Sequence, residues 1–285
     1  ISIGAPFFNQ MFTFLIVPFV LFMGIGPLTR WKSQSPKALY KQLLIAFGLS
    51  LSAGVLVNAS FESSTYMAAL GLIMSFWIVV TTIMEVLQRI EPQLSSAKST
   101  FIQSLGKLTP SHWGMVLGHL GFAVTLIGIV LVSAYNVERN VRMAVGDGIT
   151  LQGYEFVFKD VSQYTGPNYS ADVGHVDVYR HGEHVAAMAA EKRFYQVQRN
   201  VMTEAGIDSG LTRDLFVALG EQLKNGDWSL RIYVKPFINW IWLGAFIMAL
   251  GGILSISDRR YRTAKASKKS RSSTPTTPVM TEQTS

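Results

Sequence analysis

The sequence contains no cysteine, and only 15% of its 285 residues are charged. Without cysteine the chain forms no disulfide, cannot work as a thiol oxidoreductase, and cannot itself carry a covalently attached c-type haem. A glycine-rich phosphate loop, a Ser-His-Asp arrangement and a group of carboxylates at metal-ligand spacing are also missing. The sequence therefore excludes several common kinds of catalytic site, and it assigns no catalytic residue.

Hydrophobic residues, in contrast, make up 49% of the chain and gather in five blocks. Each block is about as long as the roughly 20 apolar residues that a transmembrane helix needs. We predict an α-helical polytopic membrane protein, with helices at about residues 7–28, 41–59, 66–87, 112–134 and 237–256. The chain starts with isoleucine, and no charged part of a signal peptide precedes the first block, so we interpret it as a fragment of a longer protein.

The distribution of lysine and arginine predicts the orientation of these helices. Segments 29–40 and 90–107 carry cations, whereas segment 60–65 holds one acid, Glu62, and no cation. By the positive-inside rule the basic segments face the cytoplasm. Residues 135–236 then lie outside, in the periplasm of a Gram-negative cell, and residues 257–285 form a basic, disordered cytoplasmic tail. We interpret this tail as a topology signal and not as a nucleic-acid site.

Between the fourth and fifth helices, residues 135–236 have the pattern of an inserted small β-rich domain. Apolar and polar residues alternate in the stretches 148–161, 175–180 and 228–236, as is typical of strands. The strings GDG, RHGEH and KNGDW indicate turns between such stretches. We predict about six to eight short strands in a barrel or a sandwich.

The helix expected at 112–134 carries two of the five histidines, His112 and His119. Thr109 and Pro110 precede them as the N-cap and the first helical residue. The spacing of seven residues places both imidazoles within about 20° of each other, roughly 10 Å apart along the helix axis. The opposite face is a stripe of small residues that suits close helix packing: Gly114, Gly118, Gly121, Thr125 and Gly128.

The two histidines are expected at different depths in the membrane. His112 lies at the cytoplasmic interface, where a polar side chain is tolerated, and we interpret it as an interfacial residue. His119 lies roughly 10–15 Å deeper, where it needs either a structural hydrogen bond or a function. The functional alternatives are a haem ligand, a quinol contact and a proton relay. The sequence offers no second histidine at that depth, so another axial ligand would come from a missing part of the protein or from another subunit.

Other polar and aromatic residues are weaker candidates. The histidines of the β-rich segment could bind a metal, although the string HGEH is more typical of a surface hairpin. The residues in question are His175, His181, Glu183 and His184. Glu85 is explained by a position near the cytoplasmic end of the third span. Trp240 and Trp242 are typical of an aromatic belt at the membrane surface, and they could also contact the edge of a haem.

Three long strings are specific enough to indicate relatives. They are SHWGMVLGHLGFAVTLIGIVL, MTEAGIDSGLTRDLFVALGE and KPFINWIWLGAFIMALGGILSISDRRYR. These strings resemble the C-terminal part of the CcmF family of cytochrome c-type biogenesis proteins. The resemblance extends from the start of the chain to about Arg262.

This resemblance implies the haem lyase subunit of cytochrome c maturation in the bacterial inner membrane. Such a subunit takes haem from the periplasmic chaperone CcmE, works with CcmH and CcmI, and joins haem to the CxxCH motif of apocytochromes c. Family members also hold a b-type haem in the membrane. The resemblance makes His119 its axial ligand and gives His112 no such role. The expected partners are these proteins and membrane lipid, without nucleic acid.

The chain also departs from the family pattern. The tryptophan-rich haem-handling segment, its two flanking external histidines and the other membrane histidine are absent, so the fragment is not expected to catalyse alone. A non-catalytic membrane anchor or docking subunit, and a quinol-linked haem-handling protein, are therefore kept as alternatives. Residues 200–221 are expected either to contact a partner or close over the haem segment, or to form an ordinary structured loop.

Overall fold

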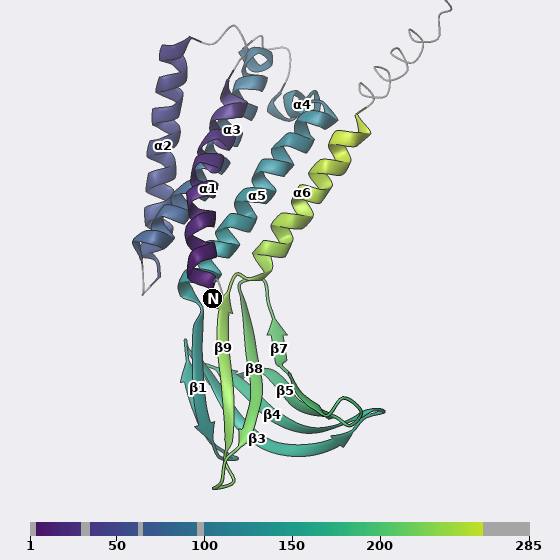
Figure 1. Ribbon diagram of the computed structural model, residues 1–285. Coiled ribbons are helices and arrows are strands. Elements are labelled where there is room, and N and C mark those ends of the chain that lie inside the picture. The colour runs from purple at the N-terminus through teal and green to yellow at the C-terminus, as the bar shows by residue number, and fades with distance from the viewer. Residues whose placement is uncertain (1–3, 30–34, 62–64, 96–99, 259–285) are drawn as a thin grey trace, which may run out of the picture.

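The computed structural model of the protein describes residues 4–29, 35–61, 65–95 and 100–258. Long helices stand side by side, and a β domain extends from one end of them (Figure 1). The long helices are α1 (Ala5–Ile25), α2 (Pro36–Ala59), α3 (Tyr66–Ser95), α5 (Pro110–Tyr135) and α6 (Asn239–Ser257). A 3-10 turn (Gly26–Leu28) follows α1, and the short helix α4 (Phe101–Gly106) precedes α5.

All five long helices are long and apolar enough to cross a membrane. Their ends differ from the predicted ones where local signals act. Helix α2 begins at Pro36, before the expected residue 41, because proline is well suited to the first helical position. Helix α3 continues past residue 87 to Ser95. Helix α4 was not predicted, and its start is fixed by a capping box between Thr100 and Gln103.

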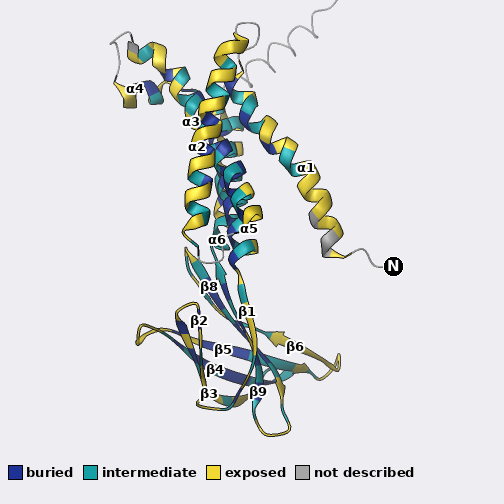
Figure 2. Cartoon of the chain, turned by 90° about the vertical axis from the view of Figure 1, so that its left-hand side faces the viewer, coloured by how far each residue is buried: buried dark blue, intermediate teal, exposed yellow. Residues whose placement is uncertain are grey.

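The helices form a row with one outlying member. Helix α3 packs between α2 and α5, and α6 packs along α5. Helix α1 contacts mainly α3, and Figure 2 shows it leaning away from the other helices toward its N-terminal end. The expected basic tail lies outside the described residues, which end at Asp258 just after α6.

The β domain contains nine strands in the described part of the chain, more than the six to eight predicted. They are β1 (Val137–Met143), β2 (Gly148–Leu151), β3 (Tyr154–Thr165), β4 (Tyr169–Arg180), β5 (Glu183–Tyr195), β6 (Asn200–Glu204), β7 (Gly206–Ser209), β8 (Arg213–Gln222) and β9 (Trp228–Pro236). The prediction was too low because segment 200–221, which could have been a loop, forms β6, β7 and most of β8. One antiparallel sheet has the order β1-β9-β8-β7, and the other has the order β2-β3-β4-β5-β6.

The two sheets enclose a common core, so the domain is a sandwich. Phe156 and Phe158 from one sheet and Leu215 and Ile232 from the other are completely buried in one cluster. Alternating residues of each strand supply this core, as the period of two in the sequence predicted. The predicted turns connect β1 to β2, β4 to β5, and β8 to β9.

Two chain segments connect the β domain to the helices, one at each end of the domain. Strand β1 follows α5, strand β9 precedes α6, and the two strands pair antiparallel from Val137 opposite Val234 (Figure 1). The buried carboxylate of Asp214 strengthens the joint. It accepts hydrogen bonds from the Ser209 hydroxyl at 3.0 Å, the Gly210 N–H at 3.2 Å and the Asn239 amide at 2.9 Å. Because Asn239 begins α6, this contact fixes the β7–β8 turn to the end of a helix.

Candidate functional site

His119, the residue predicted to bind haem, is half-buried in α5. Its Nδ1 lies 2.9 Å from the carbonyl oxygen of Met115, one helical turn earlier. A carbonyl oxygen can only accept, so Nδ1 carries the proton and Nε2 of the neutral ring keeps its lone pair. Metal-binding histidines commonly have this arrangement, in which one ring nitrogen donates to the protein and the other binds the metal.

The face of α5 opposite His119 packs very closely on α6. A Cβ atom placed on Gly114 would lie 2.6 Å from the carbonyl oxygen of Gly251. One placed on Gly121 would lie 2.7 Å from the carbonyl oxygen of Gly244. Only glycine permits this approach of the two backbones. The contact fixes the rotation of α5, and therefore the side to which His119 points.

The predicted stripe of small residues is confirmed except at one position. The Thr125 hydroxyl donates to the Ile241 carbonyl of α6 at 3.3 Å, and Gly128 lies against the backbone of the same residue. Gly118 differs, because a Cβ atom added there would meet nothing within 4 Å. The backbone of Gly118 still belongs to the contact, because a Cβ atom placed on Gly251 would lie 3.0 Å from the Gly118 nitrogen, but a side chain at Gly118 itself would be tolerated.

On the His119 side, α5 approaches α1 and α3. The ring of Phe122 stands edge-on to Phe19 of α1, with centroids 5.9 Å apart. Ala123 is completely buried in a cluster with Trp77 of α3. At 100° per residue, His119 falls between the directions of Phe122 and Ala123. The imidazole is therefore on the side of α5 that turns toward α1 and α3, away from α6.

His112 and Glu85, which were predicted near the membrane interface, are buried between helices and contact each other. Each is only 7% exposed, and Nε2 of His112 lies 3.2 Å from Oε2 of Glu85 in α3. The other Glu85 oxygen lies 3.6 Å from Nη1 of Arg89. Neighbouring helices cover these groups, although both lie near helix ends. The spacing of four residues indicates the Glu85–Arg89 pair from the sequence alone. No local sequence pattern indicates that His112, on another helix, is a second partner of Glu85.

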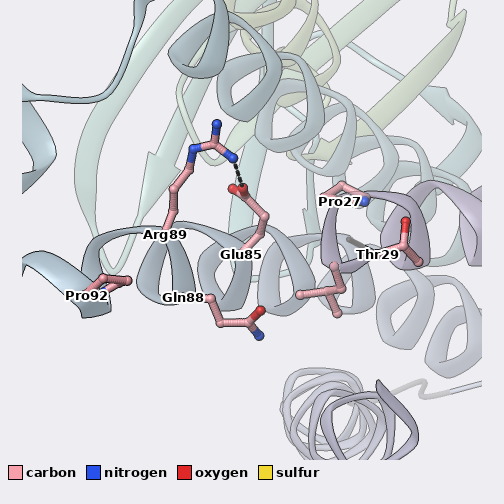
Figure 3. A pocket seen from close by; sticks show the side chains of 7 residues that line it. Pro27, Thr29, Glu85, Gln88, Arg89 and Pro92 are labelled. Atoms are coloured by element: carbon pink, nitrogen blue, oxygen red, sulfur yellow. Dashed lines mark ion pairs between the residues drawn. The ribbon is translucent and has the colours of Figure 1, made fainter. Parts of the chain in front are cut away.

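A pocket of about 300 Å³ lies next to this pair, between the 3-10 turn after α1 and helix α3 (Figure 3). Its lining residues are Pro27, Leu28, Thr29, Glu85, Gln88, Arg89 and Pro92. The volume is at the lower end of the range for ligand pockets. The two charged groups that line it, Glu85 and Arg89, form an ion pair with each other. The pocket therefore does not by itself indicate a class of ligand.

The remaining histidines belong to the β domain and do not come together. Nε2 of His175 lies 3.0 Å from the Ser162 hydroxyl, and Nε2 of His184 lies 3.6 Å from Asp177. His181 occupies the β4–β5 turn with φ +52°. Within the described residues, no group of three or more histidine and carboxylate side chains could hold a metal ion. The metal alternative for this hairpin is therefore wrong.

The two tryptophans at the start of α6 have different surroundings. Trp240 is half-buried and stands edge-on to Phe237, with ring centroids 5.2 Å apart. Trp242 is 73% exposed on the helix surface. An exposed indole at the end of a membrane helix agrees with an aromatic belt. Trp240 instead packs where the β domain joins the helices.

One arginine of the β domain has an altered pKa. Burial lowers the pKa of Arg213, but its hydrogen bonds to Asp208 and to the Tyr154 hydroxyl outweigh burial, so the pKa is raised overall. The guanidinium therefore stays charged, and it fixes the β7–β8 turn through Asp208.

Among the histidines of the chain, one is suited to be an axial ligand of a haem. His119 lies within a helix that is long and apolar enough to cross a membrane, and its Nε2 forms no hydrogen bond with the described residues. His112 is engaged by Glu85, and the other three histidines lie in the β domain. A haem with two histidine ligands would therefore need its second one from outside this sequence.

Known proteins match this chain over almost its whole length. The family described as "CcmF C-terminal beta-sandwich" matches residues 134–236, which is the β domain. The cytochrome c-type biogenesis protein CcmF of Escherichia coli K12 is 47% identical over 270 residues, which cover 94% of this chain and 40% of that protein. The CcmF of Haemophilus influenzae is 44% identical over 263 residues, which cover 92% of this chain and 40% of that protein.

A solved structure described as "Cytochrome c Heme Lyase CcmF" has a similar fold. It matches with a TM-score of 0.70 and 20% identity, over 89% of this chain and 41% of that one. At this identity the match bears on the fold alone, and it agrees with a helical membrane protein that carries an inserted β domain. The chain spans about 40% of the length of the curated relatives that it matches.

Proposed function

We propose that this chain, a homologue of the C-terminal region of the CcmF cytochrome c-type biogenesis proteins, is part of a haem lyase that attaches haem to apocytochromes c. The observation that carries the proposal is the state of His119. Its Nδ1 donates to Met115, and its Nε2 is left to bind iron. The family relationship supplies the reaction, and this histidine supplies the means by which the chain takes part in it.

His119 is the axial ligand of a b-type haem in the membrane in this proposal. When bound, such a haem supplies one-electron transfer to the haem that is being attached. The hydrogen bond from Nδ1 to the Met115 carbonyl fixes the tautomer and the ring orientation of His119, and it raises the basicity of Nε2. The glycine contacts with α6 hold α5 in one rotation. The second axial ligand comes from a polypeptide outside this sequence.

The chain lies in the bacterial inner membrane, with its β domain in the periplasm and the end of α6 in the cytoplasm. The positive-inside rule supports this orientation, because segments 29–40 and 90–107 carry cations and segment 60–65 carries none. The partners are the haem chaperone CcmE, the subunits CcmH and CcmI, and the apocytochrome with its CxxCH motif. Because this chain has no cysteine, both reacting thiols belong to the apocytochrome.

This chain alone does not carry out ligation in our proposal. Its sequence has no tryptophan-rich segment of the kind that handles haem in the family, and it has one histidine suited to the membrane haem. We infer that the His119 side of α5 provides one wall of the haem site, and that the β domain provides the surface that partners contact. The remaining groups come from outside the chain.

The test is to titrate the detergent-solubilised chain with ferrous haem b and to add carbon monoxide. With only His119 as ligand, the haem binds saturably in a five-coordinate state, and carbon monoxide occupies the open position. His119→Ala abolishes the saturable binding and the spectral change on adding carbon monoxide. His112→Asn is the matched control on the same face of α5, and it retains both.

Circular dichroism shows whether each variant keeps its helices and strands. Equal haem binding by the parent chain and a folded His119→Ala variant would overturn the role of His119. If His112→Asn lost haem binding and His119→Ala did not, the ligand would be His112, and the proposed role of His119 would be overturned as well.

A further inference from the structure

Strand β6 is an edge strand without the features that usually protect such edges. It pairs with β5 on one side, and no strand of the described residues pairs with its other side. Its first four residues, Asn200 to Thr203, are uncharged and include no proline, and its pairing with β5 is regular. An unprotected edge of this kind is a template for another strand.

The other edges of the two sheets are better protected. Strand β1 carries Glu138, Arg139 and Arg142 along its length. Strands β2 and β7 have four residues each, against five in β6, and β7 also holds Asp208 in an ion pair with Arg213. Charge and shortness are the usual ways by which a sheet avoids pairing with other chains. Strand β6 is therefore the edge at which an added strand meets least resistance.

The side chains of β6 are exposed on both faces of the sheet, so they contribute little to the core. Met202 is 48% exposed on one face, and Val201 is 55% exposed on the other. Val197, at the tip of the β5–β6 turn, is 90% exposed. Phe194, which is opposite Val201 in β5, is 43% exposed. Exposed apolar residues gathered at one edge indicate a contact surface.

Three tyrosines and an arginine extend this surface along one face. Cross-strand pairing places Tyr169 opposite Tyr195 and Arg193 opposite Met202, so all four share a face. The rings of Tyr164, Tyr169 and Tyr195 form a row, with successive centroids 6.2 and 5.5 Å apart. We call this set, Tyr164, Tyr169, Tyr195, Arg193 and Met202, the tyrosine patch. Tyrosine, arginine and methionine are the residue types enriched in protein interfaces.

The charges at the tyrosine patch are already paired. The guanidinium of Arg193 lies 4.7 Å from the centre of the Tyr169 ring. It lies 2.7 Å from a Glu191 oxygen and 3.6 Å from a Glu204 oxygen. A charged partner would have to break these contacts or remain unpaired. The surface is therefore suited to an uncharged segment.

In the membrane orientation proposed above, the position of β6 argues against a second copy of this chain as the partner. Figures 1 and 2 both show β3 on the side of its sheet that is away from the helices, and Figure 2 shows β6 on the side toward them. Two copies in one membrane with the same orientation are related by an axis along the membrane normal. Both β6 edges would then face the membrane, and neither would face the other.

We propose that β6 binds an extended, uncharged segment of a different polypeptide, which adds as a strand between β6 and the membrane side. The backbone of the segment pairs with the free edge of β6. Its alternate side chains contact the tyrosine patch on one face and Phe194 and Val201 on the other. This mode of recognition takes its affinity from main-chain hydrogen bonds and its selectivity from the side-chain contacts.

The test uses a fluorescent, end-blocked peptide of alternating threonine and valine as the probe and measures its anisotropy with the solubilised full chain. We expect saturable binding. Val201→Lys and Met202→Lys each place a charge on the edge, one on either face, and weaken binding at least tenfold. Thr150→Lys, an exposed change on the other edge strand of the same sheet, β2, leaves binding unchanged. A peptide in which every amide is N-methylated does not bind, because neither of its edges can donate to β6.

Each other result would overturn the proposal. These results are the absence of saturable binding, equal binding of the N-methylated peptide, and weakening by Thr150→Lys alone. The absence of native cysteine permits a further check for self-association. Met202→Cys in a membrane vesicle stays monomeric under oxidation, and a disulfide-linked dimer would identify a second copy as the occupant instead. All substituted side chains are exposed, so we expect the variants to fold. Circular dichroism checks that they do.

Discussion

The helices and the β domain of this protein are held together in opposite ways. The sandwich is built around large side chains such as Phe156 and Phe158, which are completely buried. The α5–α6 contact is built around positions that have no side chain, Gly114 and Gly121 against Gly251 and Gly244. One region is stabilised by filling a core, and the other by bringing two backbones together.

The difference follows from the two solvents. In water, burial of apolar surface stabilises a fold by about 25 cal/mol per Å². In a membrane, apolar side chains such as Phe14, 77% exposed, and Trp242, 73% exposed, can face lipid, so burying them gives little driving force. Close van der Waals contact and hydrogen bonds then hold the helices together. Large apolar residues exposed at the β6 edge lie outside the helices that are long and apolar enough to cross a membrane, so this edge indicates a partner where α1 and α6 do not.

The largest expected effect comes from emptying the β core. Phe156→Ala removes a completely buried ring and leaves a cavity, so we expect a loss of about 3–5 kcal/mol in the unfolding free energy of the β domain. Denaturant unfolding followed by fluorescence, in a background where the buried Trp228 is the one tryptophan kept, measures it. Val197→Ala, at a 90% exposed position, is the control and changes stability by less than about 0.5 kcal/mol. Equal effects of the two changes would contradict a packed sandwich.

The next effect comes from filling the helix contact. Gly121→Leu drives a side chain into the backbone of α6, because even its Cβ would lie 2.7 Å from the Gly244 carbonyl oxygen. We expect a loss of about 1–3 kcal/mol, or separation of the helices, in thermal unfolding of the detergent-solubilised chain. Gly118→Leu gains the same helix propensity three residues away and meets nothing within 4 Å at its Cβ. If both variants were equally stable, the glycine contact would not hold α5 on α6.

An effect of similar size but more local extent is expected at the joint between the two regions. Asp214→Ala leaves the Ser209 hydroxyl, the Gly210 N–H and the Asn239 amide without this acceptor. The cost is about 1–3 kcal/mol, because the acceptor is buried. Hydrogen exchange measures it locally: amides in the β7–β8 turn and the first turn of α6 exchange faster, while core strands do not. Uniformly faster exchange across the sandwich would show that Asp214 supports the whole domain.

The smallest effect concerns a hydrogen bond inside the helical region. The Tyr135 hydroxyl donates to the Asn58 side chain at 2.6 Å, while its ring stacks on Phe61 with centroids 4.1 Å apart. Tyr135→Phe removes only the hydrogen bond, so thermal unfolding shows a loss of about 0.5–1.5 kcal/mol. Tyr135→Ala, which also removes the stack, costs more. Identical losses in the two variants would mean that the ring contributes nothing.

Both the membrane helices and the β domain could largely be predicted from the sequence, because lipid and water each select a clear pattern of apolar residues. The span around His119 is apolar at bilayer length, and strand β9 alternates with a period of two. The stripe from Gly114 to Gly128 indicated a packing face on α5, and the structure places α6 there. Gly118 takes part in this contact through its backbone, but the sequence could not show that a side chain at this position would meet open space.

The failures of prediction concern contacts between distant segments. His112 is buried by Glu85, which lies on a different helix, and no local pattern records such a pairing. The short helix α4 and strand β6 were missed because each depends on capping or pairing rather than on a long periodic pattern. The hydrogen bond from His119 to Met115 could not be predicted from the sequence either, because a histidine in a helix can adopt several rotamers.

The central claim is that His119 binds haem iron through Nε2, and resonance Raman spectroscopy of the ferrous haem complex tests it most directly. The account predicts an iron–imidazole stretching band that shifts when the histidines carry nitrogen-15. The band is absent in His119→Ala and unchanged in His112→Asn. An iron–imidazole band that persists in a folded His119→Ala variant would contradict the account, because the ligand would then be another histidine.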